Sequence, residues 1–150
     1  AGCEIDSTKP QELNKLIEKV KKEKIVGTCS GLPEYRYTKK DLFITLGVYN
    51  IKCLNSTQRQ GGTNIFLVCN ETIKLVDEWY EIACDYKNID DTKSTSTVQD
   101  IQPTLRDHPQ HRHDQSIFSL LTKKYNIFSL GLGGAIHVIR NRTGVSWLKN

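Results

Sequence analysis

The stretch from His111 to Lys124 reads HRHDQSIFSLLTKK, and we expect it to decide the fold because a polar cluster leads directly into a helical pattern. Asp114 stands where a helix N-cap is expected, and two lysines fall in the last turn, where cations suit the helix dipole. The stretch therefore predicts a core helix with proton-exchanging side chains at its mouth. Its buried face would consist of residues at helical spacing, namely Ile117, Phe118, Leu120 and Leu121.

Two glycines precede a short apolar run about 50 residues upstream of that helix. The run from Thr63 to Cys69 is continuous in apolar character, which predicts a central strand covered on both faces. Gln60, Gly61 and Gly62 come directly before it, and glycines at that point would let the backbone approach a ligand closely. A simple turn would explain the same pair of glycines.

Helical patterns alternate with short apolar strands along the rest of the chain. A capping box beginning at Thr8 opens the first helix, Gly47 ends the second and Asn70 caps the third. Because helices and strands alternate, we expect one domain over residues 1–150, a mixed α/β sheet flanked by helices. The expected helices run from Pro10 past Val20, from Thr38 to Gly47 and from Glu71 to about Tyr86, and the expected strands cover 25–28, 126–130 and 135–139.

Three segments have a less regular pattern. Residues 30–37 and 49–59 are expected to be loops or irregular. Residues 87–110 form a long polar segment, and unstructured loops beyond ~12–15 residues are commonly lids or binding loops.

In the third expected helix, the predicted core-facing residues are Ile73, Val76, Trp79, Tyr80 and Ala83.

Composition narrows the classes of function. The net charge of +4 comes from 21 basic and 17 acidic residues that are not concentrated in one tract, so we do not expect a nucleic-acid partner. No segment reaches the ~20 apolar residues that cross a bilayer, which leaves at most a peripheral association with membranes. The five cysteines form no CxxC pair, and we expect them to be reduced and mostly buried, as in a cytoplasmic protein.

A cluster of possible metal ligands surrounds the polar start of the central helix. His108, His111 and His113 lie close in sequence to Asp107 and Asp114, and such residues could bind a metal in a hydrolase or nuclease. The spacing of two between the last two histidines suits a strand better than the turn expected here. This reaction class is therefore an alternative to the one that follows.

Four segments together resemble a family of nucleotide-sugar-dependent glycosyltransferases with the GT-A fold. They are AGCEI at residues 1–5, GGTNIFLV at 61–68, EWYEIACDY at 78–86 and HRHDQSIFSLL at 111–121. The family occurs in bacterial surface-polysaccharide clusters and in large DNA viruses. Its opening motif resembles YLDAGCEI, whose aspartate belongs to the acidic motif that holds Mn²⁺ or Mg²⁺. The chain thus resembles the C-terminal portion of such an enzyme, without the N-terminal strands of its sheet.

The resemblance implies a role for several residues. Asp114 would be the catalytic base or an acceptor anchor, and Gln115 would bind sugar hydroxyls, with Arg112 and His113 beside it. The sugar pocket would be lined by Gln60, Gly61 and Gly62. The metal would be held by His137 and Glu4. The implied activity is transfer of a sugar from a nucleotide-diphosphate donor to a carbohydrate acceptor, and a non-catalytic carbohydrate-binding fragment is a further alternative.

Overall fold

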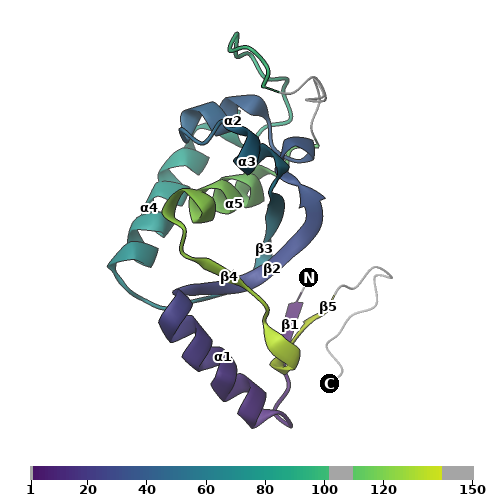
Figure 1. Cartoon of the computed structure of the whole chain (residues 1–150), viewed down its shortest axis with the longest axis vertical. Coiled ribbons are helices and arrows are strands. Elements are labelled where there is room, and N and C mark those ends of the chain that lie inside the picture. Colours follow the sequence, from purple (N-terminus) through teal and green to yellow (C-terminus); the bar gives the residue numbers. More distant parts are fainter. Residues whose placement is uncertain (1, 102–109, 140–150) are drawn as a thin grey trace.

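The computed structural model describes residues 2–101 and 110–139, which form a mixed α/β structure with two small sheets (Figure 1). In the larger sheet the strand order is β3-β2-β4. β2 (Ile25–Pro33) runs antiparallel to β3 (Thr57–Phe66) and parallel to β4 (Phe128–Leu130). The second sheet is an antiparallel pair of β1 (Gly2–Ile5) and β5 (Ile136–Ile139).

Helices flank the larger sheet. α5 (His113–Tyr125) packs between β3 and α4 (Asn70–Cys84), and α1 (Pro10–Glu23) lies at the opposite end of the molecule from α2 and α3 (Figure 1). The two short helices are α2 (Lys40–Thr45) and α3 (Ile51–Asn55). Single 3₁₀ turns occupy Glu34–Arg36, Tyr86–Asn88 and Gly133–Ala135. The predicted fold class, a mixed α/β sheet flanked by helices, is confirmed.

β2 is the strand that is covered on both faces. Ile25 and Val26 are both fully buried, but they belong to separate clusters because successive side chains of a strand point to opposite faces. Val26 packs with Leu16 and Val20 of α1, whereas Ile25 joins the larger core around α5. The apolar run at residues 63–69 was therefore wrongly predicted to be the central strand, since β3 lies at the edge of its sheet.

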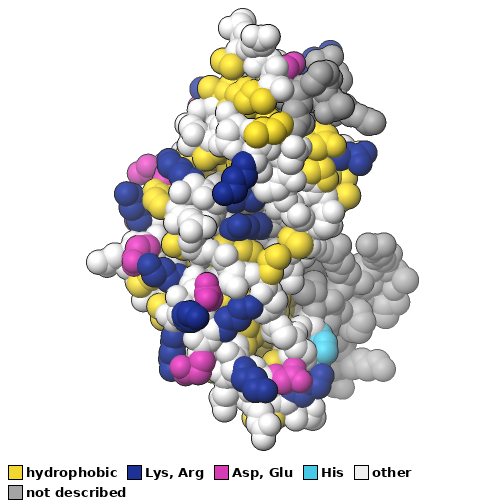
Figure 2. Space-filling model, in the orientation of Figure 1, with side chains coloured by type: hydrophobic (Ala, Val, Ile, Leu, Met, Phe, Trp, Pro, Cys, Tyr) yellow, Lys and Arg dark blue, Asp and Glu magenta, His cyan; other side chains and the backbone are white. Residues whose placement is uncertain are grey.

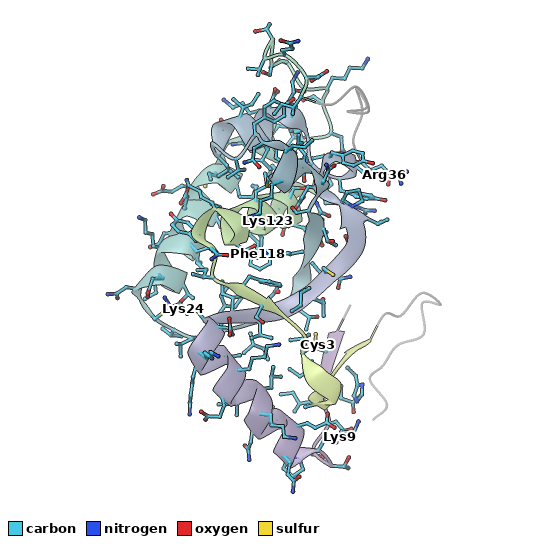
Figure 3. All side chains as sticks on the ribbon, viewed as in Figure 1. Cys3, Lys9, Lys24, Arg36, Phe118 and Lys123 are labelled. Carbon is cyan, nitrogen blue, oxygen red and sulfur yellow. The ribbon has the colours of Figure 1, made fainter. Side chains whose placement is uncertain are left out.

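The larger core is built around Phe118 of α5, whose side chain lies between the sheet and α4 (Figure 3). Its ring centroid is 5.0 Å from that of Trp79, 6.1 Å from Phe66 and 6.2 Å from Phe128. The predicted buried face of α5 is confirmed, because its four apolar residues are fully buried. Three polar residues of the helix are buried as well, and these are Ser116, Ser119 and Thr122.

The start of α5 differs from its prediction. The helix begins at His113, and Asp114 lies in its first turn with an exposed side chain instead of serving as the N-cap. Ser116 takes part of that role, since its Oγ accepts a hydrogen bond from the Arg112 N–H at 3.2 Å and donates one to the Tyr37 carbonyl at 2.8 Å. A carboxylate in the first turn still interacts favourably with the helix dipole.

Other helix starts were also predicted incorrectly. α1 begins at Pro10 as expected, but the hydroxyl of Thr8 donates to Asp6 at 2.6 Å and does not cap the helix. The N-cap of α4 is Cys69, which forms a capping box with Thr72, so Asn70 is the first helical residue. Gly47, with a φ of +68°, follows α2 as predicted.

The buried face of α4 is rotated from the predicted one. Thr72 and Leu75 are buried, and Trp79 and Ala83 pack against the core, but three predicted core residues are largely exposed. Those are Ile73 at 48%, Val76 at 44% and Tyr80 at 72% relative exposure.

The cysteines were predicted to be mostly buried, and that prediction is wrong, because Cys53 is the only one of the five that is buried. All five cysteines are free thiols.

Two segments expected to be irregular carry regular structure. Residues 30–33 extend β2, and residues 49–59 contain α3 and the start of β3. The long polar segment after α4 begins with the 3₁₀ turn that ends at Asn88 and is irregular from there through residue 101, and Asp41 holds part of it by accepting hydrogen bonds from residues 94–96. None of the helices formed by residues 2–101 and 110–139 has both the length and the apolar character needed to cross a membrane.

Candidate functional site

A polar pocket of about 250 Å³ opens where β2 and β3 meet the N-terminal end of α5. Residues from three separate parts of the chain form it, because the antiparallel pairing of β2 and β3 places them beside the mouth of the helix. We name it the glutamine pocket, because three of its residues are glutamines. Its lining consists of Ser30, Leu32, Tyr37, Gln58, Gln60, Arg112 and Gln115.

Gln115 is fixed at the junction of the helix and the strand. Its Oε1 accepts a hydrogen bond from the Gly61 N–H at 3.1 Å, and its Nε2 donates one to Gln58 Oε1 at 2.8 Å. A Cβ atom at Gly61 would lie 3.3 Å from Gln115 Cβ, a tighter contact than most Cβ atoms make. The strand can therefore approach the helix this closely because residue 61 is a glycine.

Gln58 is held in turn by buried polar groups. Its Nε2 donates to Thr38 Oγ1 and to Ser116 Oγ, both at 3.2 Å. Thr38 Oγ1 donates to Oε2 of the fully buried Glu34 at 2.8 Å. A continuous chain of hydrogen bonds thus runs from the buried carboxylate to Gln115, and buried polar networks of this kind fix side-chain positions when every member is satisfied.

The remaining wall of the glutamine pocket combines an aromatic ring with further polar groups. The guanidinium carbon of Arg112 lies 5.2 Å from the ring centroid of Tyr37, within the range of a cation–π contact. Gln60 Oε1 accepts a hydrogen bond from the Thr28 hydroxyl at 2.8 Å. Ser30 and Leu32 complete the wall on β2. The pocket therefore offers amide, hydroxyl and guanidinium groups next to an apolar surface.

The structure brings together some of the residues that the resemblance implied and not others. Gln60, Arg112 and Gln115 line the glutamine pocket, and Gly61 contacts Gln115 directly. Gly62 lies further along β3, where an added Cβ would meet nothing within 4 Å.

Asp114 and His113 lie at the same helix mouth, but neither is among the lining residues. Both side chains are exposed. Trp79 Nε1 donates a hydrogen bond to the backbone carbonyl of Asp114 at 3.0 Å, so the Asp114 carboxylate takes no part in that contact. His113 Nε2 lies 3.2 Å from Asp91 Oδ1. His113 also has a φ of +49°, a left-handed conformation that is uncommon for a residue other than glycine.

Glu4 and His137, the two implied metal ligands, lie directly opposite each other in the pairing of β1 with β5. Opposed residues of antiparallel strands have side chains on the same face of the sheet. His137 Nε2 is also 3.4 Å from Asp6 Oδ2. Mg²⁺ is commonly bound through one or two carboxylates, with water and substrate phosphates completing its shell, and Glu4 supplies one carboxylate on this face.

No group of three or more His, Cys, Asp or Glu side chains comes together around a possible metal position in the described ranges 2–101 and 110–139. His111, part of the alternative metal cluster, is buried with both ring nitrogens engaged. Nδ1 accepts the Lys39 N–H at 3.3 Å, and Nε2 lies 2.8 Å from the Asn88 carbonyl. It therefore has no free nitrogen for a metal; Asp107 and His108 lie outside the described residues.

Burial of His111 predicts a pH dependence of stability. Desolvation is the main cause that lowers its pKa below the usual 6.5, so the folded protein binds this proton less readily than the unfolded chain does. The stabilisation is fully present above pH 6.5 and is lost as the pH falls through the window below it. We expect the free energy of unfolding, measured with urea, to drop more between pH 7 and pH 5.5 in the wild type than in His111→Gln, by at most ~1.4 kcal/mol per pH unit. Equal drops would contradict this assignment.

No family model, curated protein or solved structure matches the chain.

Several lining residues were missed from the sequence. Tyr37 and Gln58 fell in segments expected to be irregular, and Ser30 and Leu32 lie in the unpredicted extension of β2. One signal was available for Gln58, because it is two residues before Gln60 and side chains with that spacing share one face of a strand. That signal requires the start of β3 to be known, and the polar sequence of residues 57–62 does not reveal it.

Proposed function

We propose that the glutamine pocket binds a carbohydrate and that the protein transfers a sugar from a nucleotide-diphosphate donor to a hydroxyl acceptor. The observation that supports the first part most strongly is the anchoring of Gln115 between Gly61 and Gln58 at the mouth of α5. The second part rests on the resemblance of four segments to GT-A glycosyltransferases, together with the position of Asp114 next to Gln115 in the sequence of α5.

The chemistry of the pocket suits a sugar. Each sugar hydroxyl both donates and accepts hydrogen bonds, and each glutamine amide offers both kinds of group. The ring of Tyr37 and the side chain of Leu32 provide apolar surface for the C–H groups of a sugar ring. A volume of about 250 Å³ lies below the ~300–1,000 Å³ typical of drug-sized sites, which favours a single sugar unit.

The proposed reaction assigns separate tasks to the residues of this chain. Gln115 and Gln60 bind hydroxyls and hold the sugar in one orientation, because alignment of the reacting atoms lowers the barrier. The exposed carboxylate of Asp114 accepts the proton of the attacking hydroxyl or anchors the acceptor. Glu4 and His137 would hold Mn²⁺ or Mg²⁺. When bound, that metal supplies charge neutralisation for the departing diphosphate.

A turnover assay on the full-length protein, as its gene encodes it, tests the proposal. Nucleotide-diphosphate sugars are offered with a panel of saccharide acceptors, and release of the nucleoside diphosphate is measured with Mn²⁺ or Mg²⁺ present. We expect release that depends on both the donor and the acceptor. Saccharide binding without turnover of any donor would instead support the non-catalytic carbohydrate-binding alternative.

A further inference from the structure

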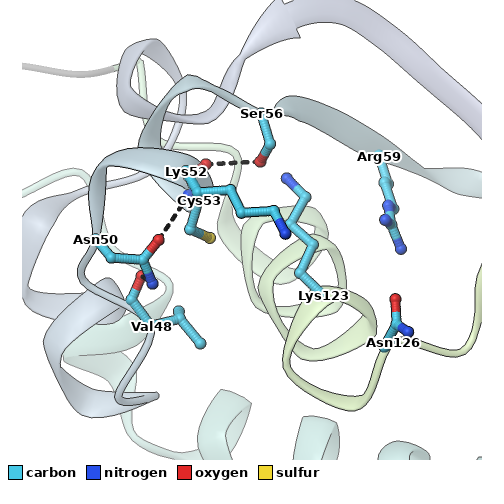
Figure 4. A pocket seen from close by; sticks show the side chains of 8 residues that line it. All are labelled: Val48, Asn50, Lys52, Cys53, Ser56, Arg59, Lys123 and Asn126. Atoms are coloured by element: carbon cyan, nitrogen blue, oxygen red, sulfur yellow. Dashed lines mark hydrogen bonds between the residues drawn. The ribbon is translucent and has the colours of Figure 1, made fainter.

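A second pocket, of about 270 Å³, lies between α3, β3 and the C-terminal end of α5 (Figure 4). Arg59 reaches it from β3, whereas Gln58 and Gln60, its neighbours on the strand, line the glutamine pocket on the other face. We name it the basic pocket, because Lys52, Arg59 and Lys123 all contribute to it. Its lining consists of Val48, Asn50, Lys52, Cys53, Ser56, Arg59, Lys123 and Asn126.

The basic pocket has more positive charge than its surroundings neutralise. No carboxylate is among its lining residues, although the buried Glu34 pairs with Lys123. On the face shown in Figure 2, basic side chains over the region of α3 and α5 lie without acidic neighbours, whereas those over α1 and α4 alternate with acidic ones. Lys52 is exposed on α3. Lys52 is thus available to a ligand, and Arg59 lines the same pocket.

Arg59 has an incomplete set of partners. Its guanidinium carbon lies 4.3 Å from the ring centroid of Phe128, and its Nη1 is buried. Within residues 2–101 and 110–139, Nη1 has no hydrogen-bond partner. Leaving a charged donor buried and unpaired is costly, and a bound anion would remove that cost. Burial also lowers the pKa of Arg59 and of Lys123, which an anion would oppose.

The helix end next to the pocket does not prevent an anion from binding. The last carbonyls of a helix carry partial negative charge, but here the chain itself caps them. Lys123 O accepts the N–H of Asn126 at 3.3 Å, and Thr122 O accepts the N–H of Ile127 at 3.4 Å. Asn126 adopts the left-handed conformation of a C-cap, and in Figure 4 its amide extends toward Arg59.

We propose that the basic pocket binds the phosphate group of a small phosphorylated ligand. A planar guanidinium with an unpaired N–H, next to the ammonium group of Lys52, is a set of donors that recognises phosphate oxygens. The volume of about 270 Å³ has room for a diphosphate or a sugar phosphate. This site lies on the other face of β3 from the glutamine pocket, and it does not depend on the proposed sugar transfer.

Calorimetric titration of the full-length protein with inorganic pyrophosphate tests the proposal. EDTA is present to exclude any metal-dependent donor site, and the ionic strength is held constant with NaCl. We expect saturable 1:1 binding that Lys52→Gln weakens by ~10-fold or more, since each charge-assisted hydrogen bond contributes strongly. Arg59→Gln is expected to abolish it. Lys15→Gln, an exposed position on α1, serves as the matched control and should leave binding unchanged.

The choice of variants keeps the result decisive. Arg59→Gln removes packing on Phe128 and can reduce stability, whereas Lys52 is exposed, so Lys52→Gln should fold normally. A parallel titration with glucose 1-phosphate distinguishes the two sources of the phosphate group. Tighter binding of glucose 1-phosphate than of pyrophosphate indicates a sugar phosphate, and the reverse indicates a diphosphate. The proposal is overturned if neither probe binds saturably up to ~10 mM, roughly the weak limit for a specific site. It is also overturned if Lys52→Gln and Lys15→Gln bind pyrophosphate equally well.

Discussion

Replacing Glu34 with glutamine is expected to lower the free energy of unfolding by ~3–5 kcal/mol, because removing one partner of a buried ion pair leaves the other charge uncompensated. Glu34 is fully buried, and only 12% of the Lys123 side chain is exposed. The carboxylate accepts hydrogen bonds from Lys123, Ser119 and Thr38. An amide at this position would retain the shape and lose the charge. Urea unfolding monitored by circular dichroism measures the effect.

Two further variants identify the cause of that loss. The double variant Glu34→Gln with Lys123→Met should recover part of the stability, because neither member of the pair is then left buried with an uncompensated charge. Glu18→Gln breaks the exposed pair with Lys21 on α1 and should cost at most ~0.5 kcal/mol. If Glu34→Gln costs no more than Glu18→Gln, the buried pair does not stabilise the fold in the way described here.

Replacing Asp114 with asparagine is expected to reduce the rate of sugar transfer by ~10²–10⁴-fold, the usual cost of losing a general base. The amide has nearly the same size as the carboxylate but cannot accept the proton of the acceptor hydroxyl. The Asp114 side chain is exposed, and the hydrogen bond from Trp79 goes to its backbone carbonyl. The variant should therefore fold as the wild type does. Steady-state turnover with saturating donor and acceptor gives kcat.

The interpretation of that result depends on which kinetic constant changes. A base lowers kcat, whereas a residue that only anchors the acceptor raises its KM. Asp77→Asn on the exposed side of α4 is the matched control, and it should leave both constants unchanged. Unaltered turnover in Asp114→Asn would show that this carboxylate is not the base, which would separate the reaction centre from the mouth of α5.

α5 could be predicted from the sequence because its apolar residues recur with helical spacing and are large enough to form the core. What the pattern could not show is that the opposite side of the helix is buried too. Ser116 and Ser119 are polar, so hydropathy places them in solvent, yet they are fully buried and bind Gln58 and the backbone of Arg59. Gln58 and Arg59 are distant from these serines in sequence, so a local pattern does not reveal the contacts.

α4 shows a second limit of sequence patterns. Apolar residues occur on two sides of this helix, so periodicity alone did not determine which side faces α5. The packing of Leu75 and Trp79 on the larger core decides it, and Ile73, Val76 and Tyr80 remain exposed. The start of β3 was missed for a related reason, since its buried residue Gln58 faces polar groups and leaves no apolar signal.

The candidate site was predictable only in part. The two glycines were expected to let the backbone approach a ligand, whereas Gly61 lies within β3 and approaches Gln115 of α5; three implied residues do line one pocket. The pairing of β2 with β3 brings Gln58 and the segment of Tyr37 to that pocket, and this pairing includes irregular register shifts. Sequence spacing does not encode such shifts, so the composition of the pocket wall required the structure.

The central claim is that the glutamine pocket binds a carbohydrate, and two-dimensional ¹H–¹⁵N NMR of the glutamine side-chain amides tests it most directly. The probe is a saccharide titrated into the wild type and into Gln115→Ala, with Gln11→Ala on exposed α1 as the control. We predict that the amides of Gln58, Gln60 and Gln115 shift together and that Gln115→Ala weakens binding by ~10-fold, as loss of a paired hydrogen-bonding group should. Shifts confined to other residues, or equal affinity in Gln115→Ala and Gln11→Ala, would contradict the claim.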